Sequence, residues 1–218
     1  MVKLMTDEEL IELEGYYKNL LLMGETSFVY DYFEITKTGI NEESPNGKWT
    51  LKRIVNTKTP LNIVIPDFIQ VIGANSFCYH SKPIVSVEIP DGVEKIGKAA
   101  FRDCPITKVV LPSTLKKIDT LAFYTNKLRE LYIPDSVEQI GAGAFCYNES
   151  LKSLSLPSGI ILYDDAFKYC GRYYSKSEIN FEVRTNPNTP DFNHIECHHH
   201  AFYQSPFGEL AKEYLCTT

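Results

Sequence analysis

The sequence predicts a repeat solenoid, in which short turns of chain stack into one elongated domain. Two residue types recur in phase, and each turn also carries a short run of alternating apolar residues. Chance does not keep two such series in phase, so we expect five turns of about 22–24 residues. The prolines are Pro66, Pro90, Pro112, Pro134 and Pro157, and the phenylalanines, each preceded by Ser or Ala, are Phe77, Phe101, Phe123, Phe145 and Phe167.

A short strand is expected before every proline. Apolar residues lie one and three positions before it, and period-two alternation is typical of a half-buried strand. Proline cannot donate to a ladder and therefore ends the strand. Because the turns are nearly equal in length, successive strands should stack in parallel. The inward pairs are Ile63/Ile65, Val87/Ile89, Val109/Leu111, Leu131/Ile133 and Leu154/Leu156.

The second half of each turn adds two aliphatic residues. The first of them lies three positions after the proline. The second is an isoleucine in four turns and falls one residue early, at Leu162, in the fifth. A glycine follows it in three turns, at Gly73, Gly97 and Gly141, and we expect it to supply a backbone angle that other residues avoid. Asp119 replaces it in the third turn, and Asp tolerates such angles better than most residues. No turn can bury its apolar groups alone, whereas stacked turns can.

These turns resemble the BspA-like subclass of leucine-rich repeats. The resemblance rests on IVSVEIPDGVEKIGKAAFRDC at Ile84–Cys104 and LRELYIPDSVEQIGAGAFC at Leu128–Cys146, and it departs in the fifth turn at Leu162-Tyr163. It implies a right-handed leucine-rich-repeat superhelix with a parallel sheet on the concave face and short helices or turns on the other face. It also implies a secreted or cell-surface protein with an adhesin-like role.

Both ends of a solenoid need caps, and we divide the chain accordingly. Residues 1–49 form the N-terminal cap, in which the capping box Thr6–Glu9 predicts a helix from about Asp7 to Met23, ending near Gly24. Strands are expected at Phe28–Ile35 and at Trp49–Val55, the latter as a degenerate zeroth turn. Residues 50–170 hold the five repeats. Residues 171–218 form an irregular sixth turn and a C-terminal cap, with a strand at Ile179–Val183 and a helix at Phe207–Leu215.

Composition argues against several classes of function. The net charge is −6 and the pI is about 5.4, and no basic stripe is visible, so we expect neither nucleic-acid binding nor attachment to an anionic membrane. No apolar run is long enough for membrane insertion. The N-terminus lacks a secretory signal, so the protein is either intracellular or exported by a signal outside this chain. Four of the six cysteines recur near the repeat phenylalanines and are expected to be small core residues rather than disulfides.

The sharpest cluster of chemically active side chains is His194–His200. Its metal-ligand candidates are His194, Cys197, His198 and His200, but their spacing matches no standard zinc module, and a polar loop on an inserted turn is the favoured interpretation. A Cys–His nucleophile pair would need an orienting group and an oxyanion site, and the sequence identifies neither. We therefore expect no enzyme and no cofactor. The recurring Asp67, Asp91 and Asp135 are interpreted as turn formers rather than calcium ligands.

The best candidate binding surface is the outward side of the strands. Solenoid curvature creates an extended surface there, and Tyr132 is the expected anchor because interface hot spots favour aromatic residues. We expect a binding module for another protein or a glycan. The alternatives are a structural spacer or display domain of a larger surface protein, and a metal-binding protein. The predicted contact residues are Val64, Ser86, Glu88, Lys108, Val110, Glu130, Tyr132, Ser153, Ser155, Asn180 and Glu182.

Overall fold

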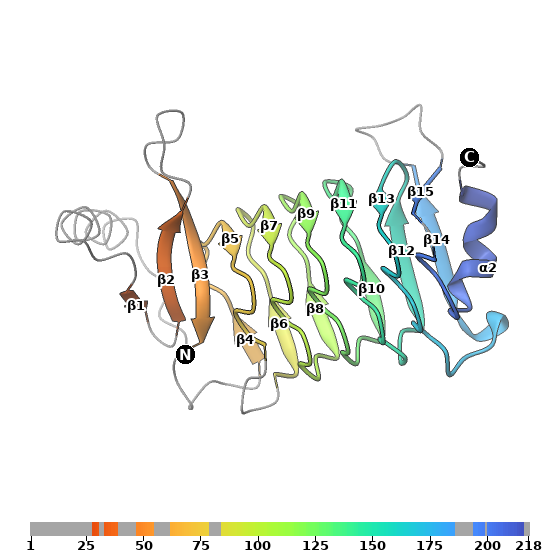
Figure 1. The fold of residues 1–218 in the computed structure, drawn as a ribbon, viewed down its shortest axis with the longest axis horizontal. Coiled ribbons are helices and arrows are strands. Elements are labelled where there is room, and N and C mark those ends of the chain that lie inside the picture. The colour runs from red at the N-terminus through yellow and green to blue at the C-terminus, as the bar shows by residue number, and fades with distance from the viewer. Residues whose placement is uncertain are drawn as a thin grey trace.

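The chain forms an elongated stack of turns, as the repeat pattern predicts (Figure 1). The computed structural model describes residues 28–30, 33–38, 47–54, 62–78, 84–185, 194–198 and 200–215. Antiparallel strands lie at the N-terminal end of the stack, and a short helix lies at the C-terminal end. Between them, each turn contributes one strand to each of two opposite sides of the stack.

The strands that precede the prolines lie on one side of the stack, which we call the front, and they are parallel to one another. The five expected strands are confirmed, and a sixth joins them at the place predicted for the irregular turn. The front is split into two three-stranded sheets, because the third and fourth strands touch without pairing in one ladder. The strands are β4 (Asn62–Val64), β6 (Ser86–Glu88), β8 (Lys108–Val110), β10 (Glu130–Tyr132), β12 (Ser153–Pro157) and β14 (Asn180–Arg184).

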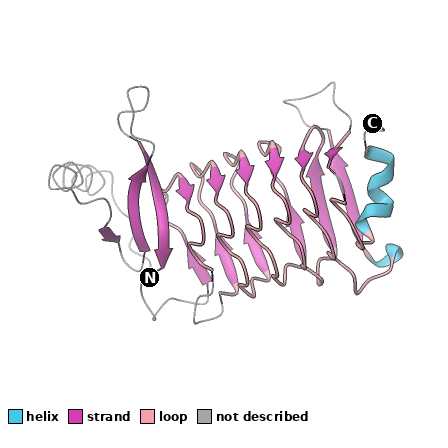
Figure 2. Ribbon diagram, in the orientation of Figure 1, coloured by secondary structure: helices cyan, strands magenta, loops and turns pink. Residues whose placement is uncertain are grey.

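A second sheet of two-residue repeat strands lies on the opposite side, where short helices or turns were expected, and a turn follows each of these strands (Figure 2). Equal turn lengths bring backbone N–H and C=O groups of neighbouring turns together on this side too, and two-residue strands satisfy them. This nine-stranded sheet also includes the N-terminal strands. Its repeat strands are β5 (Val71–Ile72), β7 (Lys95–Ile96), β9 (Lys117–Ile118), β11 (Gln139–Ile140), β13 (Ile161–Leu162) and β15 (Glu196–Cys197).

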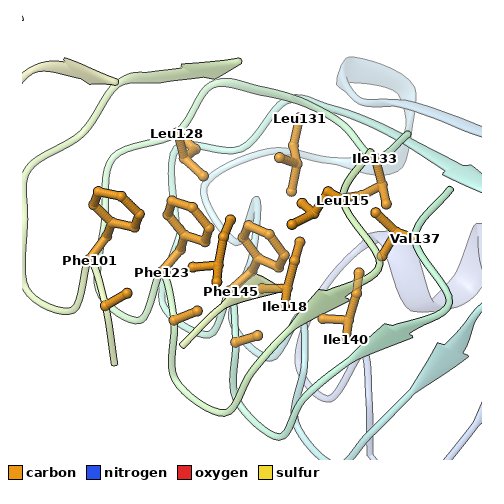
Figure 3. Close-up of a cluster of buried hydrophobic side chains, with 14 of the residues drawn as sticks. Phe101, Leu115, Ile118, Phe123, Leu128, Leu131, Ile133, Val137, Ile140 and Phe145 are labelled. Atoms are coloured by element: carbon orange, nitrogen blue, oxygen red, sulfur yellow. The ribbon is translucent and has the colours of Figure 1, made fainter. Parts of the chain in front are cut away.

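The core is a column of phenylalanine rings with aliphatic side chains around it (Figure 3). From Phe77 to Phe167 the ring centroids of successive turns are 4.4, 5.0, 5.2 and 5.3 Å apart, and Phe202 extends the stack by 5.4 Å. Offset stacking at such distances stabilises aromatic pairs beyond the area they bury. The alanine or serine before each ring is buried against the neighbouring turns. The small-residue–Phe signature thus marks the centre of the solenoid.

Side chains three residues after Phe101, Phe123, Phe145 and Phe167 form a second column, which links the turns by hydrogen bonds. Asn126 Nδ2 donates to the Phe101 carbonyl (2.8 Å), and Asn148 Nδ2 donates to the Phe123 carbonyl (3.0 Å). Cysteine takes the same place in two other turns, where the Cys104 and Cys170 thiols donate to the carbonyls of Phe77 (3.2 Å) and Phe145 (3.0 Å). The prediction that these cysteines are core residues is confirmed for Cys104, Cys146 and Cys170, which are buried and outside any disulfide.

The repeat glycines serve close approach, so the expectation of an unusual backbone angle is wrong. Gly73, Gly97 and Gly141 are not among the residues with positive φ. A Cβ at Gly141 would lie 2.5 Å from the backbone nitrogen of Thr120, and one at Gly97 would lie 2.7 Å from the carbonyl carbon of Gly73. Positive φ occurs instead two residues before each phenylalanine. The residues there are Asn75, Ala99, Leu121, Gly143, Asp165 and His200.

The fifth turn keeps its register despite its irregular sequence. Leu162 pairs with Ile140 in the second sheet, and the spacing from this position to the phenylalanine is five residues in both turns. The fifth turn has one residue fewer than the other turns between its proline and β13, and this difference changes only the bend there. The solenoid therefore runs on without a break into the sixth turn, where β14 pairs with β12 and β15 pairs with β13.

The N-terminal cap is seen in part. The helix predicted at Asp7–Met23 and its end at Gly24 lie outside the described residues. The single strand predicted at Phe28–Ile35 is instead two strands, β1 (Phe28–Tyr30) and β2 (Phe33–Thr38), which pair antiparallel. The strand predicted at Trp49–Val55 is β3 (Lys48–Ile54), which pairs antiparallel with β2 and parallel with β5. Its parallel pairing gives β3 the place of a zeroth turn in the second sheet.

The C-terminal cap closes the far end of the phenylalanine column. The helix predicted at Phe207–Leu215 is α2 (Phe207–Ala211), followed by the 3-10 helix η2 (Lys212–Tyr214), and the 3-10 helix η1 (Lys176–Glu178) precedes β14. Phe207 is fully buried, with its ring centroid 6.1 Å from that of Phe181 in β14. The cap thereby covers apolar surface that the last turn would otherwise expose.

Candidate binding surface

The predicted contact residues come together on one side of the front sheets. We call the outward side chains of β4, β6, β8, β10, β12 and β14 the front face. In the register of the strands, Val64, Glu88 and Val110 lie side by side, as do Tyr132, Ser155 and Glu182. A parallel row contains Ser86 and Lys108 in one sheet, and Glu130, Ser153 and Asn180 in the other.

Three of the large apolar side chains exposed on the described surface belong to the front face. The exposed fractions are 40% for Val64, 47% for Val110 and 56% for Tyr132. Val109 and Leu111, which flank Val110, are only half-buried, unlike the inward pairs of the other four regular turns. The seam between β8 and β10 thus combines exposed apolar surface with a break in the sheet.

Tyr132 is held in place by a neighbour that the sequence analysis did not select. The Arg184 guanidinium lies 4.0 Å from the centroid of the Tyr132 ring. Arg184 also donates to the Asp135 carboxylate (2.8 Å) and to the Ser155 hydroxyl. The sequence did contain a signal for Arg184. The outward residues of β14 are every second residue, Asn180 and Glu182, and the next in this series is Arg184. Such fixed geometry lowers the entropy lost when the aromatic ring is buried by a partner.

Three pockets adjoin the front face at the edge where its strands begin. One, of about 400 Å³, opens at the seam between β8 and β10 and is lined by Thr107, Lys108, Arg129 and Glu130. A second, of about 320 Å³, shares Arg129 and Glu130 with it. The third, of about 530 Å³, shares Ser150 with the second. The three pockets therefore form one continuous strip, which the sequence analysis missed.

Tyrosines gather beside this strip, on the turns that follow the phenylalanines. The Tyr147 ring lies 5.5 Å from Tyr124 and 4.7 Å from Tyr169, and Tyr169 lies 6.5 Å from Tyr203. The Lys168 ammonium lies 5.5 Å from the Tyr169 ring centroid and 5.1 Å from that of Tyr203. The signal in the sequence was a tyrosine one or two residues after the phenylalanine in five turns.

The histidine cluster completes the sixth turn of the solenoid. Glu196 and Cys197 form β15, so part of the cluster is a strand rather than a loop. His198 takes the place that Tyr163 has in the fifth turn and stacks on it, with centroids 4.6 Å apart. His200 packs against Tyr203 at 5.3 Å. Among the described residues, which leave out His199, no three His, Cys, Asp or Glu side chains gather as metal ligands would.

The core cysteines are poor candidates for nucleophilic chemistry. Burial raises the pKa of the Cys104 thiol to about 12 and that of Cys146 to about 11. Burial also raises the pKa of Cys170 well above its ordinary value. The thiolate is the reactive form, so these three thiols stay protonated and unreactive near neutral pH.

In the part of the chain that the structure describes, no helix has both the length and the apolar character needed to cross a bilayer.

Comparison with known proteins places the repeats in a family. The sequence model of the BspA type leucine rich repeat region matches residues 56–174 with six copies. No curated protein matches the chain. A solved leucine-rich repeat protein from Bacteroides capillosus is 26% identical, with a TM-score of 0.50, over 58% of this chain and 95% of that one.

Two further solved structures share the fold. The T. pallidum leucine rich repeat protein is 20% identical, with a TM-score of 0.55, over 72% of this chain and 81% of its own. The pneumococcal vaccine antigen PcpA is 19% identical, with a TM-score of 0.53, over 80% of this chain and 50% of its own.

Proposed function

Since this chain belongs to the BspA-type leucine-rich-repeat family, we propose that it is a non-enzymatic binding module whose front face receives another protein. The observation that carries the proposal is the exposed Tyr132, which Arg184 holds in place beside the apolar seam. Aromatic anchors of this kind dominate the energy of many interfaces. The mixed charges around it, from Glu88, Lys108, Glu130 and Glu182, suit the polar rim of such an interface.

The family resemblance also supports a place outside the cell or at its surface, with an adhesin-like role. In that setting the front face would bind a protein of the extracellular surroundings rather than another protein inside the same cell. Protease treatment of intact cells should then remove the protein, whereas a protein retained inside the cell would survive until lysis.

The test of the front face is a comparison of two double variants. The immobilised chain captures proteins from its native surroundings, and a captured protein is then purified for affinity measurements. Tyr132→Ala with Glu130→Ala should weaken its binding at least tenfold, because an anchor ring and a neighbouring polar contact are lost together. Tyr163→Ala with Glu138→Ala removes the same residue types from positions that flank strands of the second sheet and should leave the affinity unchanged.

Equal affinities for the unaltered chain and the Tyr132/Glu130 variant would refute the proposal. They would favour the alternative that the stack is a spacer or display domain, since a spacer needs no particular front face. The unfolding midpoint of each variant serves as the control for folding.

A further inference from the structure

The strip of pockets at the start of the front strands carries four cations that make no ion pair. Lys108, Lys127, Arg129 and Lys152 all line these pockets. Within the described part of the chain, none of the four takes part in an ion pair. Most other described cations, such as Lys116 with Glu138, do have one. In a chain of net charge −6, four neighbouring unpaired cations are unexpected and indicate an anionic ligand.

The carboxylates of the strip do not neutralise this row. Glu149 is already engaged, because the Arg172 guanidinium lies 2.8 Å from it and the Tyr173 hydroxyl donates to it. Glu130 is the one other acidic residue among those that line the three pockets. A ligand carboxylate would therefore meet Arg129, which makes no ion pair, and Lys152, whose ammonium lies 5.7 Å from the centroid of the Tyr174 ring. Arg129 offers a planar fork of donors that fits a carboxylate in two hydrogen bonds.

The other lining residues narrow the class of anion. The described residues that line the three pockets include no aliphatic side chain; they are tyrosines, hydroxyls, amides and charged groups. A peptide site would be expected to offer aliphatic pockets for side chains. Tyrosine rings instead suit the flat C–H face of a pyranose ring, and Thr107, Ser150 and Asn180 can hydrogen-bond to sugar hydroxyls.

From these features we infer that the strip is a binding site for an acidic glycan, a chain of pyranose units that carry carboxylates. A sugar ring lies against the exposed Tyr173, and carboxylates of the glycan pair with Arg129 and Lys152. Arg129 and Lys152 directly precede the paired residues Glu130 and Ser153, so these two cations start about one strand spacing apart, and a linear glycan can follow the stack. The site is separate from the Tyr132 anchor and does not depend on the proposed protein partner.

Calorimetric titration of the whole chain with a hexameric oligogalacturonate tests the inference. Arg129→Gln with Lys152→Gln should weaken binding at least tenfold, and raising the salt concentration should weaken binding to the unaltered chain. Lys98→Gln with Lys117→Gln is the matched control, since it removes two other cations that have no ion pair and should leave affinity unchanged. Tyr173→Ala should weaken oligogalacturonate binding several-fold.

Three results would overturn the inference: no binding at millimolar oligosaccharide, equal binding by both double variants, or equal binding of a neutral oligosaccharide with reduced carboxyl groups. A poly-glutamate peptide of matched charge should bind much more weakly. Equal binding of that peptide would replace the glycan with an acidic protein segment. Tyr132→Ala should not change oligogalacturonate binding, so this test can fail without touching the front-face proposal.

Discussion

Replacing Gly141 with alanine should destabilise the solenoid for a steric reason. The added Cβ would lie 2.5 Å from the Thr120 nitrogen and 2.7 Å from the Asp119 carbonyl carbon, and both are backbone atoms of the preceding turn. Ordinary contact begins at 3.4 Å, so the two turns must separate by nearly 1 Å. That separation strains the hydrogen bond from the Gly141 N–H to the Ile118 carbonyl (2.8 Å). Overpacking of this kind costs about 1–3 kcal/mol.

The unfolded chain offsets part of this cost. Alanine restricts the unfolded backbone more than glycine does, which favours folding by about 0.4–1 kcal/mol. A net loss of about 1–2 kcal/mol remains, which corresponds to a fall in the thermal midpoint of roughly 2–8 °C for a chain of this size. Differential scanning calorimetry and urea denaturation measure both quantities.

Gly143→Ala is the matched comparison, two residues away. Gly143 has a φ of 61°, but Ala99 occupies the same place in the second turn with a φ of 53°. Its added Cβ would meet mainly the flexible end of the Leu121 side chain. The strain of alanine at positive φ is about 1–2 kcal/mol and exceeds the gain from the unfolded chain of about 0.4–1 kcal/mol, so a loss smaller than that of Gly141→Ala is expected. If Gly143→Ala proved the more destabilising of the two, the steric account of the repeat glycines would be wrong.

Two more predictions concern the column that links the turns. Asn148→Ala should cost about 2–4 kcal/mol in urea denaturation, because it leaves the Phe123 carbonyl and the Leu128 N–H without their buried side-chain partner. Asn148→Cys should cost clearly less, since Cys170 donates from the same place in the next turn; equal losses would contradict this. For Cys104, thiols of the unfolded chain ionise near pH 9.0, whereas the folded thiol holds its proton to about 12. The folded state is therefore destabilised as pH rises through that window. Cys104→Ala should flatten this fall in unfolding free energy between pH 8 and 10.5, and an unchanged slope would exclude the thiol as its source.

Much of the front face follows from the sequence pattern. The alternation before each proline identifies which side chains point inward and are buried. This can be seen within a single turn, without knowledge of its neighbours. The same pattern located β14 beyond the last regular repeat, because Ile179, Phe181 and Val183 keep the alternation. It stopped short of Arg184, which lies one step further along the strand and proved to be the partner of Tyr132.

The sequence alone determined the period, the inward residues and the strands that precede the prolines, since apolar spacing directly reflects what a stacked turn must bury. The tertiary structure decided what depends on contacts between turns. It showed the second sheet, the glycines that admit the neighbouring backbone, and the position of Lys108, Arg129 and Lys152 along one strip of pockets. Those three residues are 21 and 23 positions apart in the chain, and only the stacking of one turn on the next brings them to the same strip.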